Sequence, residues 1–442
     1  MDHKPLFGHI RHAHLPSDIT RFTEQPLRRA SKLASDELAN HIRKMGLCCI
    51  MRDIAIVATA PLADMMPPAV GQIFQEKSME VGYAPVFQNL DDKMSDRDVY
   101  REELRLCDMA EPLGFDSIWE PEHHFTNYEM TPDVLQFLTY MAGRTTRVKL
   151  GSMVVVLPWH DPVRVAEQIS LLDHFSNGRA ILGMGRGLGA VEFDGFRLDM
   201  TQSRQQFTEY AEAIVNALAT GKIEFDGELY KQPPRYLRPA PFKSFEGRLY
   251  GAGLSPETGP LLARLGLGMM IIPLKAWQEV EENLRQYNVL WADQRGGSAP
   301  PCAAVGFTIV HHDAEKAREM AYKYIGRYFE SIIDHYDLAG DRIKGTKGYE
   351  YYSTTVDAEQ DKQNETIRNF VELMPWGTPE QVIDKIRMIN RHTRNGTYIA
   401  HFAFGGMPFA EAEESMRLFA SEVMPTLQEM PVTSFEVEPV GA

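Results

Sequence analysis

The sequence contains few cysteines, and they show no pairing pattern. Its 442 residues include only four, at Cys48, Cys49, Cys107 and Cys302, with no C-x-x-C motif and no metal-ligand spacing. This scarcity argues against a disulfide-stapled fold and against a metal held by cysteines. The four thiols are predicted to be reduced and buried, as is typical of a cytoplasmic protein.

A long apolar run and a surplus of basic residues are also missing. The longest apolar stretch, residues 47–63, is interrupted by Arg52 and Asp53, so no segment of transmembrane length is predicted. No signal peptide is predicted either. The formal net charge of -15 argues against binding to nucleic acid or to anionic membranes, because the long-range field has the wrong sign.

The first 77 residues differ in character from the rest of the chain. His3, His9, His12 and His14 are scattered there among basic residues. A solvated tail is favoured over a metal site, since no carboxylate or cysteine spacing completes a ligand set. We predict an N-terminal arm at residues 1–77 and a single domain at residues 78–442.

From residue 80 onward, short buried strands alternate with helices. Strands are predicted at residues 81–88, 117–120, 149–157, 180–184, 248–253, 269–272, 302–310 and 398–404. Such alternation predicts parallel βα units, and eight of them predict an α/β fold, a (β/α)8 TIM barrel with insertions and an N-terminal extension. Two long excursions, residues 225–245 and 336–365, are predicted as functional loops, the second as an active-site lid.

The strand at residues 117–120 is followed directly by Glu122, His123 and His124. The carboxyl ends of barrel strands line the active site, which favours a functional role for an imidazole at this position. Adjacent side chains in extended backbone point in opposite directions, so one histidine is expected inside the site, with Glu122 orienting it. A metal site at the three residues is the rival hypothesis. No metal is predicted, because neighbouring residues rarely converge on one ion.

Two later strand ends carry anion-binding patterns, each with a plain alternative. Arg186 lies in a glycine-rich turn, residues 183–189, whose spacing differs from that of a dinucleotide fingerprint. The turn is either a phosphate clamp or a tight turn with a surface arginine. Ser255 precedes a helix that begins near Glu257 and Thr258, and this start is either an anion site or an ordinary helix cap.

Taken together, these stretches resemble the bacterial luciferase-like flavin monooxygenases. The resemblance runs from residue 80 to about residue 419, and its specificity lies in the order and spacing of several short motifs. Those motifs are residues 114–119 (GFDSIW), 122–125 (EHHF), 151–158 (GSMVVVLP), 162–167 (PVRVAE), 172–173 (LD), 176–179 (SNGR), 183–187 (GMGRG), 255–258 (SPET) and 377–380 (GTPE).

The resemblance implies a barrel that binds reduced FMN and reacts it with O2, oxygenating a small hydrophobic substrate through a flavin hydroperoxide. A separate reductase would supply the reduced FMN, and helices at residues 134–144 and 163–175 would form a homodimer. By matching position, His123 would be catalytic with Glu122 beside it, and Met153 and Val154 would form a non-proline cis peptide under the flavin. The phosphate would be held by Arg186 and by Ser255 with the amides near Glu257 and Thr258.

An apolar substrate wall is expected from Phe87, Phe125 and Trp159, near Met153. Two positions depart from luciferase itself, where Gly185 stands in place of a cysteine and Asp161 in place of a histidine. Both departures argue against light emission. Two alternatives stay open at this point: a deazaflavin-dependent oxidoreductase on the same fold, and a non-catalytic flavin-binding protein.

Overall fold

The structure is a computed structural model that describes residues 77–253, 257–272, 274–340, 345–346, 349 and 359–436. The predicted arm lies outside these residues up to residue 76, so its boundary stays a prediction. Ser255 and half of the predicted lid at residues 336–365 also lie outside the described residues.

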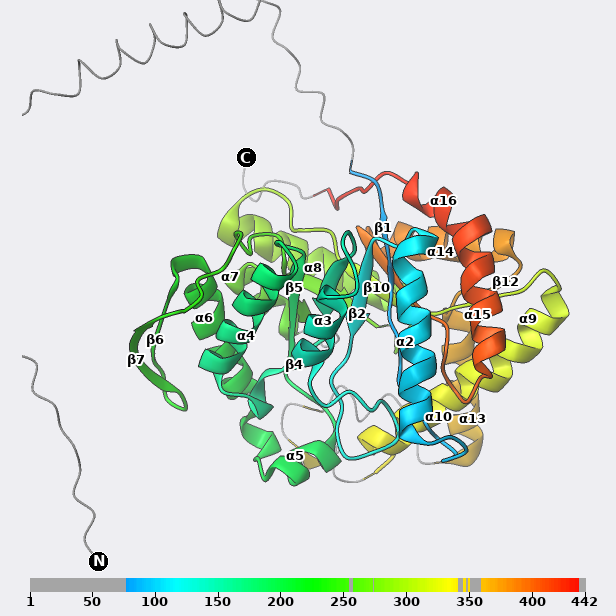
Figure 1. The fold of residues 1–442 in the computed structure, drawn as a ribbon, viewed down its shortest axis with the longest axis horizontal. Helices are drawn as coiled ribbons and strands as arrows, with labels where there is room; N and C mark the ends of the chain where they lie inside the picture. The colour runs from blue at the N-terminus through cyan, green and yellow to red at the C-terminus, as the bar shows by residue number, and fades with distance from the viewer. Residues whose placement is uncertain are drawn as a thin grey trace, which may run out of the picture. The chain divides into compact units, whose positions relative to one another are not determined.

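Eight parallel strands form a closed barrel, with helices around them (Figure 1). Around the barrel the order is β3-β2-β1-β13-β10-β9-β8-β5, and pairing of β3 with β5 closes the ring. This confirms the predicted (β/α)8 fold and all eight predicted strands. The strands are β1 (Glu80–Tyr83), β2 (Ser117–Glu120), β3 (Lys149–Ser152), β5 (Ala180–Gly185), β8 (Leu249–Ala252), β9 (Gly268–Ile271), β10 (Ala303–Phe307) and β13 (Thr397–His401).

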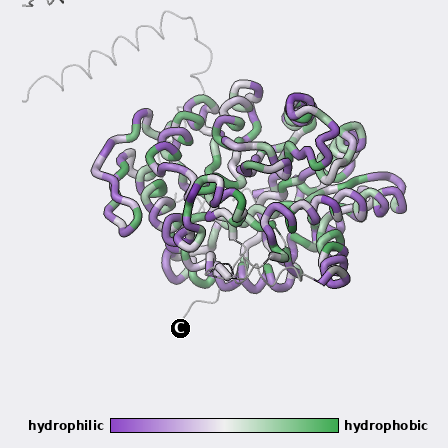
Figure 2. The backbone as a smooth tube through the Cα atoms, turned by 90° about the horizontal axis from the view of Figure 1, so that it is seen from below, coloured by the Kyte–Doolittle hydropathy of each residue, from purple (hydrophilic) through white to green (hydrophobic). Residues whose placement is uncertain are grey.

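Helices follow most of these strands and cover the barrel. Hydrophilic stretches lie mainly along the outer turns when the molecule is seen from below (Figure 2). The helices are α2 (Asp96–Leu113), α3 (Val134–Ala142), α4 (Pro162–Phe175), α5 (Ala190–Phe196), α6 (Ser203–Thr220), α7 (Thr258–Leu265), α8 (Trp277–Arg295), α9 (Ala314–Met320), α10 (Gly326–Tyr336), α13 (Gln360–Leu373), α14 (Pro379–Thr393), α15 (Phe409–Leu418) and α16 (Met424–Gln428).

Local sequence signals explain where several helices begin and end. Ser95 caps α2 by accepting a hydrogen bond from the backbone N–H of Asp98, and Gly114 ends that helix in the left-handed conformation, as predicted. Asp161 caps α4 by accepting from the N–H groups of Val163 and Arg164. Asp161 therefore has a structural task at the start of the helix.

The barrel interior is filled by side chains, with Trp119 at its centre. Trp119 is paired across β2 and β3 with Gly151, and a Cβ at Gly151 would lie 2.2 Å from the indole ring. Only glycine leaves room for the ring at that level of the barrel. The indole Nε1–H donates to Ser117 Oγ at 2.8 Å, which satisfies its polar group inside an apolar core.

The predicted loop at residues 225–245 contains regular structure instead. An antiparallel hairpin, β6 (Lys222–Asp226) and β7 (Lys231–Tyr236), extends beside α6 (Figure 1). Short strand pairs also occur at β4 (Val155–Val156), which joins β5, and between β11 (Ile309–Val310) and β12 (Trp376–Gly377). Among the described residues, no helix is both long and apolar enough to cross a bilayer.

Candidate active site

A cavity opens at the carboxyl ends of the barrel strands. It contains about 1450 Å³ of atom-free space, part of it open to solvent. Four neighbouring strands bring the predicted site residues to its wall: β2 brings His123, β3 brings Met153 and Val154, β5 brings Arg186, and β8 leads to Glu257 and Thr258.

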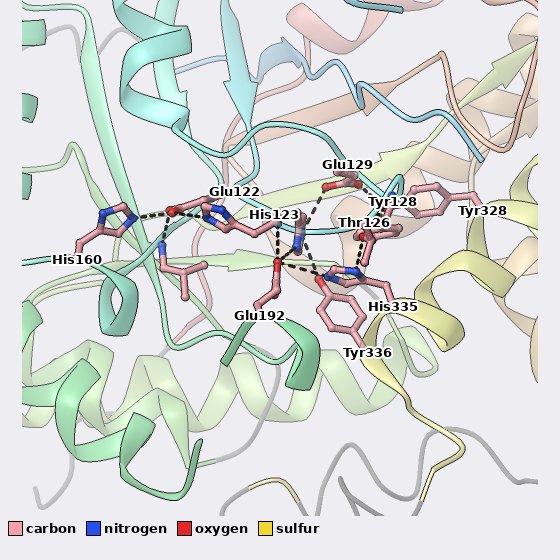
Figure 3. Close-up of polar contacts among 12 residues, drawn as sticks. Glu122, His123, Thr126, Tyr128, Glu129, His160, Glu192, Tyr328, His335 and Tyr336 are labelled. Carbon is pink, nitrogen blue, oxygen red and sulfur yellow. Dashed lines mark hydrogen bonds and ion pairs between the residues drawn. The ribbon is translucent and has the colours of Figure 1, made fainter. Parts of the chain in front are cut away.

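His123 lies at the cavity wall between two buried glutamates (Figure 3). Its Nδ1 is 3.1 Å from Glu192 Oε1, and its Nε2 is 3.4 Å from Glu129 Oε2 and 3.2 Å from the hydroxyl of Tyr336. The backbone N–H of His123 donates to the carbonyl of Thr131, so the segment after β2 folds back on itself. This return brings Glu129 opposite the ring.

The two glutamates beside His123 have pKa values displaced in opposite directions. Burial favours the neutral form of Glu192, but His123 and His335 outweigh it and lower the pKa of Glu192 to about 2. Burial raises the pKa of Glu129 to about 7, although His123 and Tyr328 oppose the shift. Burial lowers the pKa of His123, but the charges of Glu192, Glu129 and Glu122 outweigh it and the net direction is upward. The ring is therefore held toward its protonated form by Glu192.

Glu122 has different partners from the one predicted. Its Oε1 lies 3.2 Å from His124 Nε2 and 2.5 Å from His160 Nε2, while its Oε2 accepts from the backbone N–H of Val156 at 2.9 Å. Glu122 therefore orients His124 and His160, and Glu192 orients His123. The prediction that Glu122 orients His123 is therefore corrected. The partner of His123 Nδ1 is Glu192 on α5, which lies 69 residues further along the chain.

Only one of the two adjacent histidines lines the cavity, as expected from their alternating directions. His124 packs instead against the rings of Phe125, Trp159 and Phe196, at centroid distances of 5.6, 5.2 and 4.7 Å. His124 is therefore packed among aromatic rings and does not line the cavity.

The Met153–Val154 peptide bond is cis, and both residues line the cavity. Val154 also explains the glycine at position 185, since a Cβ there would lie 2.3 Å from Val154 Cγ2. The bulk of Val154 therefore favours glycine at position 185. Met153 and Val154 thus form an apolar part of the cavity wall.

Cationic side chains and a helix start line another part of the cavity. Arg186 and Arg204 both line it, together with Glu257 and Thr258 at the beginning of α7. Arg204 forms an ion pair of 3.1 Å with Glu257, and the guanidinium of Arg186 lies 4.0 Å from the ring centre of Tyr349. Two arginines and the N-terminus of a helix fit a phosphate group.

The three predicted substrate residues occupy three different environments. Trp159 lines the cavity, and its indole N–H is buried with no hydrogen-bond partner among the described residues. Phe87 is fully buried away from the cavity lining, packed against Tyr100 and Phe137, because β1 ends at Tyr83 and the chain then turns into the core. Phe125 is 60% exposed and is also absent from the lining. Of the three residues predicted to contact the substrate, only Trp159 lines the cavity.

Several polar residues of the site were missed by sequence reasoning. They come from segments without a motif: the loop after β2, the short helix α5, and α10. They are Glu129, Tyr128, Glu192, Tyr328, His335 and Tyr336 (Figure 3). Glu129 follows the motif at residues 122–125 by four residues and was visible in the sequence, but no spacing rule pointed to it.

His123, Glu192 and His335 lie close enough for metal ligation, with their candidate ligand atoms within 4.8 Å of one another. The same distances arise from the hydrogen bond between His123 and Glu192 and from the 3.4 Å approach of His335 Nε2 to Glu192 Oε1. His335 Nδ1 is in turn 2.8 Å from the hydroxyl oxygen of Thr126. We assign the cluster to hydrogen bonding and place no metal there.

Comparison with known protein families gives a match over most of the barrel. The family model described as luciferase-like monooxygenase matches residues 79–393. The alkanal monooxygenase alpha chain of Photorhabdus luminescens is 30% identical over 344 residues, which cover 76% of this chain and 94% of that protein. The oxygenase component of the flavin-dependent trigonelline monooxygenase of Acinetobacter baylyi is 24% identical, covering 78% of this chain and 94% of that protein.

Solved structures share the same fold. The monooxygenase RslO1 from Streptomyces bottropensis has a TM-score of 0.66 and 25% identity, covering 79% of this chain and 99% of that chain. A coenzyme F420-dependent tetrahydromethanopterin reductase from Methanopyrus kandleri has a TM-score of 0.58 at 18% identity, covering 79% and 99% of the two chains. At that identity the second likeness concerns the fold alone.

Proposed function

Because the chain belongs to the luciferase-like monooxygenase family, we propose that it is the FMN-dependent oxygenase component of a two-component monooxygenase. A separate reductase supplies reduced FMN, and O2 oxygenates a small, mainly hydrophobic organic substrate. The observation that carries the proposal is one cavity lined by His123, the cis Met153–Val154 peptide and the arginines at positions 186 and 204. The trigonelline relative, itself an oxygenase component, supports the division of labour between two proteins.

In this proposal each group of cavity residues has its own task. Reduced FMN, when bound, supplies the electrons that activate O2. Arg186, Arg204 and the amides at the start of α7 bind its phosphate, and Met153 and Val154 lie under its ring. His123 holds or accepts a proton at Nε2, the ring nitrogen on the side of Glu129 and Tyr336. The apolar wall excludes water from the reacting groups.

A deazaflavin cofactor is the second candidate, since an F420-dependent enzyme shares the barrel. Anaerobic titration with reduced FMN and with reduced F420 separates the two. We expect tight binding of reduced FMN, followed by O2 consumption and formation of an oxygenated product on addition of substrate. Tight binding of F420 alone, without O2 consumption, contradicts the proposal.

Replacement of Arg186 tests the proposed phosphate site. Arg186→Ala should weaken FMN affinity through loss of a charge-assisted contact of about 1.5–3 kcal/mol, roughly ten- to a hundredfold in dissociation constant. Arg197→Ala is the matched control, because Arg197 ends α5 outside the cavity lining. An unchanged dissociation constant in Arg186→Ala places the phosphate elsewhere.

We also propose a homodimer formed through α3 and α4. These two helices pack against each other and expose Tyr140, Leu171 and Phe175, with exposed fractions of 50%, 40% and 56%. Large apolar side chains exposed together on adjacent helices are typical of a protein interface. Sedimentation of the purified protein tests this proposal, and a monomer at micromolar concentration contradicts it.

A further inference from the structure

Glu129 is placed to act on His123, although no motif marks it. The segment between β2 and α3 is tied back by two backbone hydrogen bonds, from His123 to Thr131 and from Met130 to Phe87. Glu129 lies within this tied segment, is 3% exposed, and lines the cavity beside His123. Its position therefore follows from a fixed backbone path.

The carboxyl group of Glu129 is oriented by tyrosine hydroxyls. Tyr328 donates a hydrogen bond of 2.6 Å to Glu129 Oε1, and the hydroxyl of Tyr128 lies 2.7 Å from that of Tyr328. The ring of His335 stacks on Tyr128 at 4.6 Å, which restrains the tyrosine in turn. Oε2 is left facing Nε2 of His123 at 3.4 Å.

The charges around His123 do not allow both flanking glutamates to ionise freely. Two buried carboxylates beside one imidazolium leave an excess buried negative charge, which is costly. Glu192 on α5 stays ionised because His123 and His335 both face it. Glu129 meets His123, Tyr328 and the charge of Glu192, and burial raises its pKa to about 7. The other titratable groups that face this pair are Glu120 on β2, Glu103 on α2, and Tyr128, Glu122 and Tyr336.

We propose that Glu129 and His123 form one proton-sharing pair at the cavity wall. The proton moves between Nε2 of His123 and Oε2 of Glu129, so that imidazolium and carboxylate become neutral imidazole and carboxylic acid. Glu192 meanwhile keeps the N–H bond at Nδ1. Glu129 acts through His123 and is a positioning residue in this reaction.

The catalytic role of the pair rests on the proposed function, which requires a group that can both accept and release a proton. Glu192 raises the proton affinity of His123, so near neutral pH the ring alone stays protonated and is rarely free to accept a proton. A second carboxyl group that exchanges the same proton gives the site a group able both to accept and to release it near pH 7. The proton sharing itself is a property of the ligand-free protein.

Histidine NMR of the ligand-free protein tests the pair directly. The protein is labelled with [13C]histidine, and His123→Ala assigns the His123 resonance. The wild-type resonance is expected to titrate in two steps, because two interacting groups share macroscopic pKa values. In Glu129→Gln we expect a single step and proton binding weaker by roughly tenfold, since an opposite charge nearby is lost. A single step with the same midpoint in wild type and Glu129→Gln overturns the proposal.

Two further variants keep the test decisive. Glu330→Gln removes an exposed glutamate from the same helix as Tyr328 and should leave the His123 titration unchanged. Tyr328→Phe keeps both members of the pair but removes the donor to Glu129, so both steps should move to higher pH. If Glu129→Gln fails to fold, an unshifted titration in Tyr328→Phe overturns the proposal by itself.

The outcome separates this proposal from the proposed function. A two-step titration in a protein that does not bind reduced FMN supports the pair and contradicts the function. Where FMN binding and turnover are found, the pH profile of kcat should lose its limb near neutrality in Glu129→Gln while KM changes little. A profile that keeps its limb contradicts the pair and leaves the function intact.

Discussion

Two glutamate–histidine clusters lie side by side after β2, and they are built from the same parts (Figure 3). Glu122 lies between His124 and His160, and Glu192 lies between His123 and His335. Each glutamate side chain is fully buried, and in each case the histidines outweigh the cost of burial and lower its pKa. Residue type alone therefore does not distinguish them.

The clusters differ in what surrounds their imidazoles. Neither imidazole of the Glu122 cluster lines the cavity, and Glu122 also accepts the backbone N–H of Val156. In the Glu192 cluster, His123 lines the cavity and its second ring nitrogen meets Tyr336 and Glu129. Both glutamates accept a backbone N–H, Glu122 from Val156 and Glu192 from His124. We call the Glu122 cluster closed and the Glu192 cluster open, because only the second brings an imidazole to the cavity. We therefore expect access to the cavity to decide the role of each histidine.

The largest expected effect separates His123 from its neighbour. His123→Ala should retain FMN binding but lower the rate of product formation by about 10²–10⁴-fold, because a positioned acid–base group is lost. Reduced flavin should then release hydrogen peroxide instead of product. His124→Ala is the matched control and should retain coupling in the folded fraction. Equal uncoupling by both variants removes the distinction between the clusters, as measured by product and peroxide yields.

The closed cluster should contribute more clearly to stability. Glu122→Gln leaves two imidazoles without their carboxylate, and breaking a buried pair costs about 3–5 kcal/mol in the free energy of unfolding. Denaturant unfolding of the wild type and of Glu122→Gln measures the loss. A loss below about 1 kcal/mol, the size of an exposed ion pair, indicates that the cluster is solvated.

The pH dependence of that loss has a definite sign. Hydrogen bonds from His124 and His160 outweigh burial and lower the pKa of Glu122, so its contribution is present above about pH 4.3 and lost as pH falls through the folded value. Burial lowers the pKa of His160, but Glu122 outweighs it and the net direction is upward. The contribution of His160 is therefore present below about pH 6.5 and lost as pH rises through the folded value. The stability difference should be largest between these limits, and a maximum above pH 8 contradicts the assignment.

The barrel could be predicted from the sequence because each strand is a short apolar run ended by polar or glycine residues. The hairpin of β6 and β7 could not, since β7 contains two adjacent prolines and is mostly exposed, without an alternating apolar face. Burial gives strands a readable pattern, and an exposed ribbon lacks that signal. Phe87 was also misplaced by the sequence pattern. The strand was predicted to reach residue 88, but β1 ends at Tyr83 and Phe87 is buried beyond it.

The site was predictable only where function lies in local motifs. His123, Arg186 and Met153–Val154 each lie in a motif at a strand end, and the structure brings them to one cavity. Glu192 and Tyr336 reach His123 from 69 and 213 residues away in the chain, across α5 and α10. Such contacts arise from tertiary packing, and no spacing within one sequence encodes them. The partner of His123 was therefore misassigned to the nearest glutamate.

The smallest expected effect concerns Tyr336, whose hydroxyl lies 3.2 Å from Nε2 of His123. Tyr336→Phe removes one hydrogen-bonding group and keeps the ring, so we expect a change of about 0.5–1.5 kcal/mol, at most roughly tenfold in proton binding or coupling. Tyr322→Phe, on a hydroxyl that meets Glu372 outside the cavity, is the control. If Tyr336→Phe uncouples the enzyme as strongly as His123→Ala, the tyrosine itself supplies the proton. The feature that distinguishes the open cluster from the closed one would then be the hydroxyl of Tyr336, and Glu129 would contribute less than Tyr336 to proton transfer at His123.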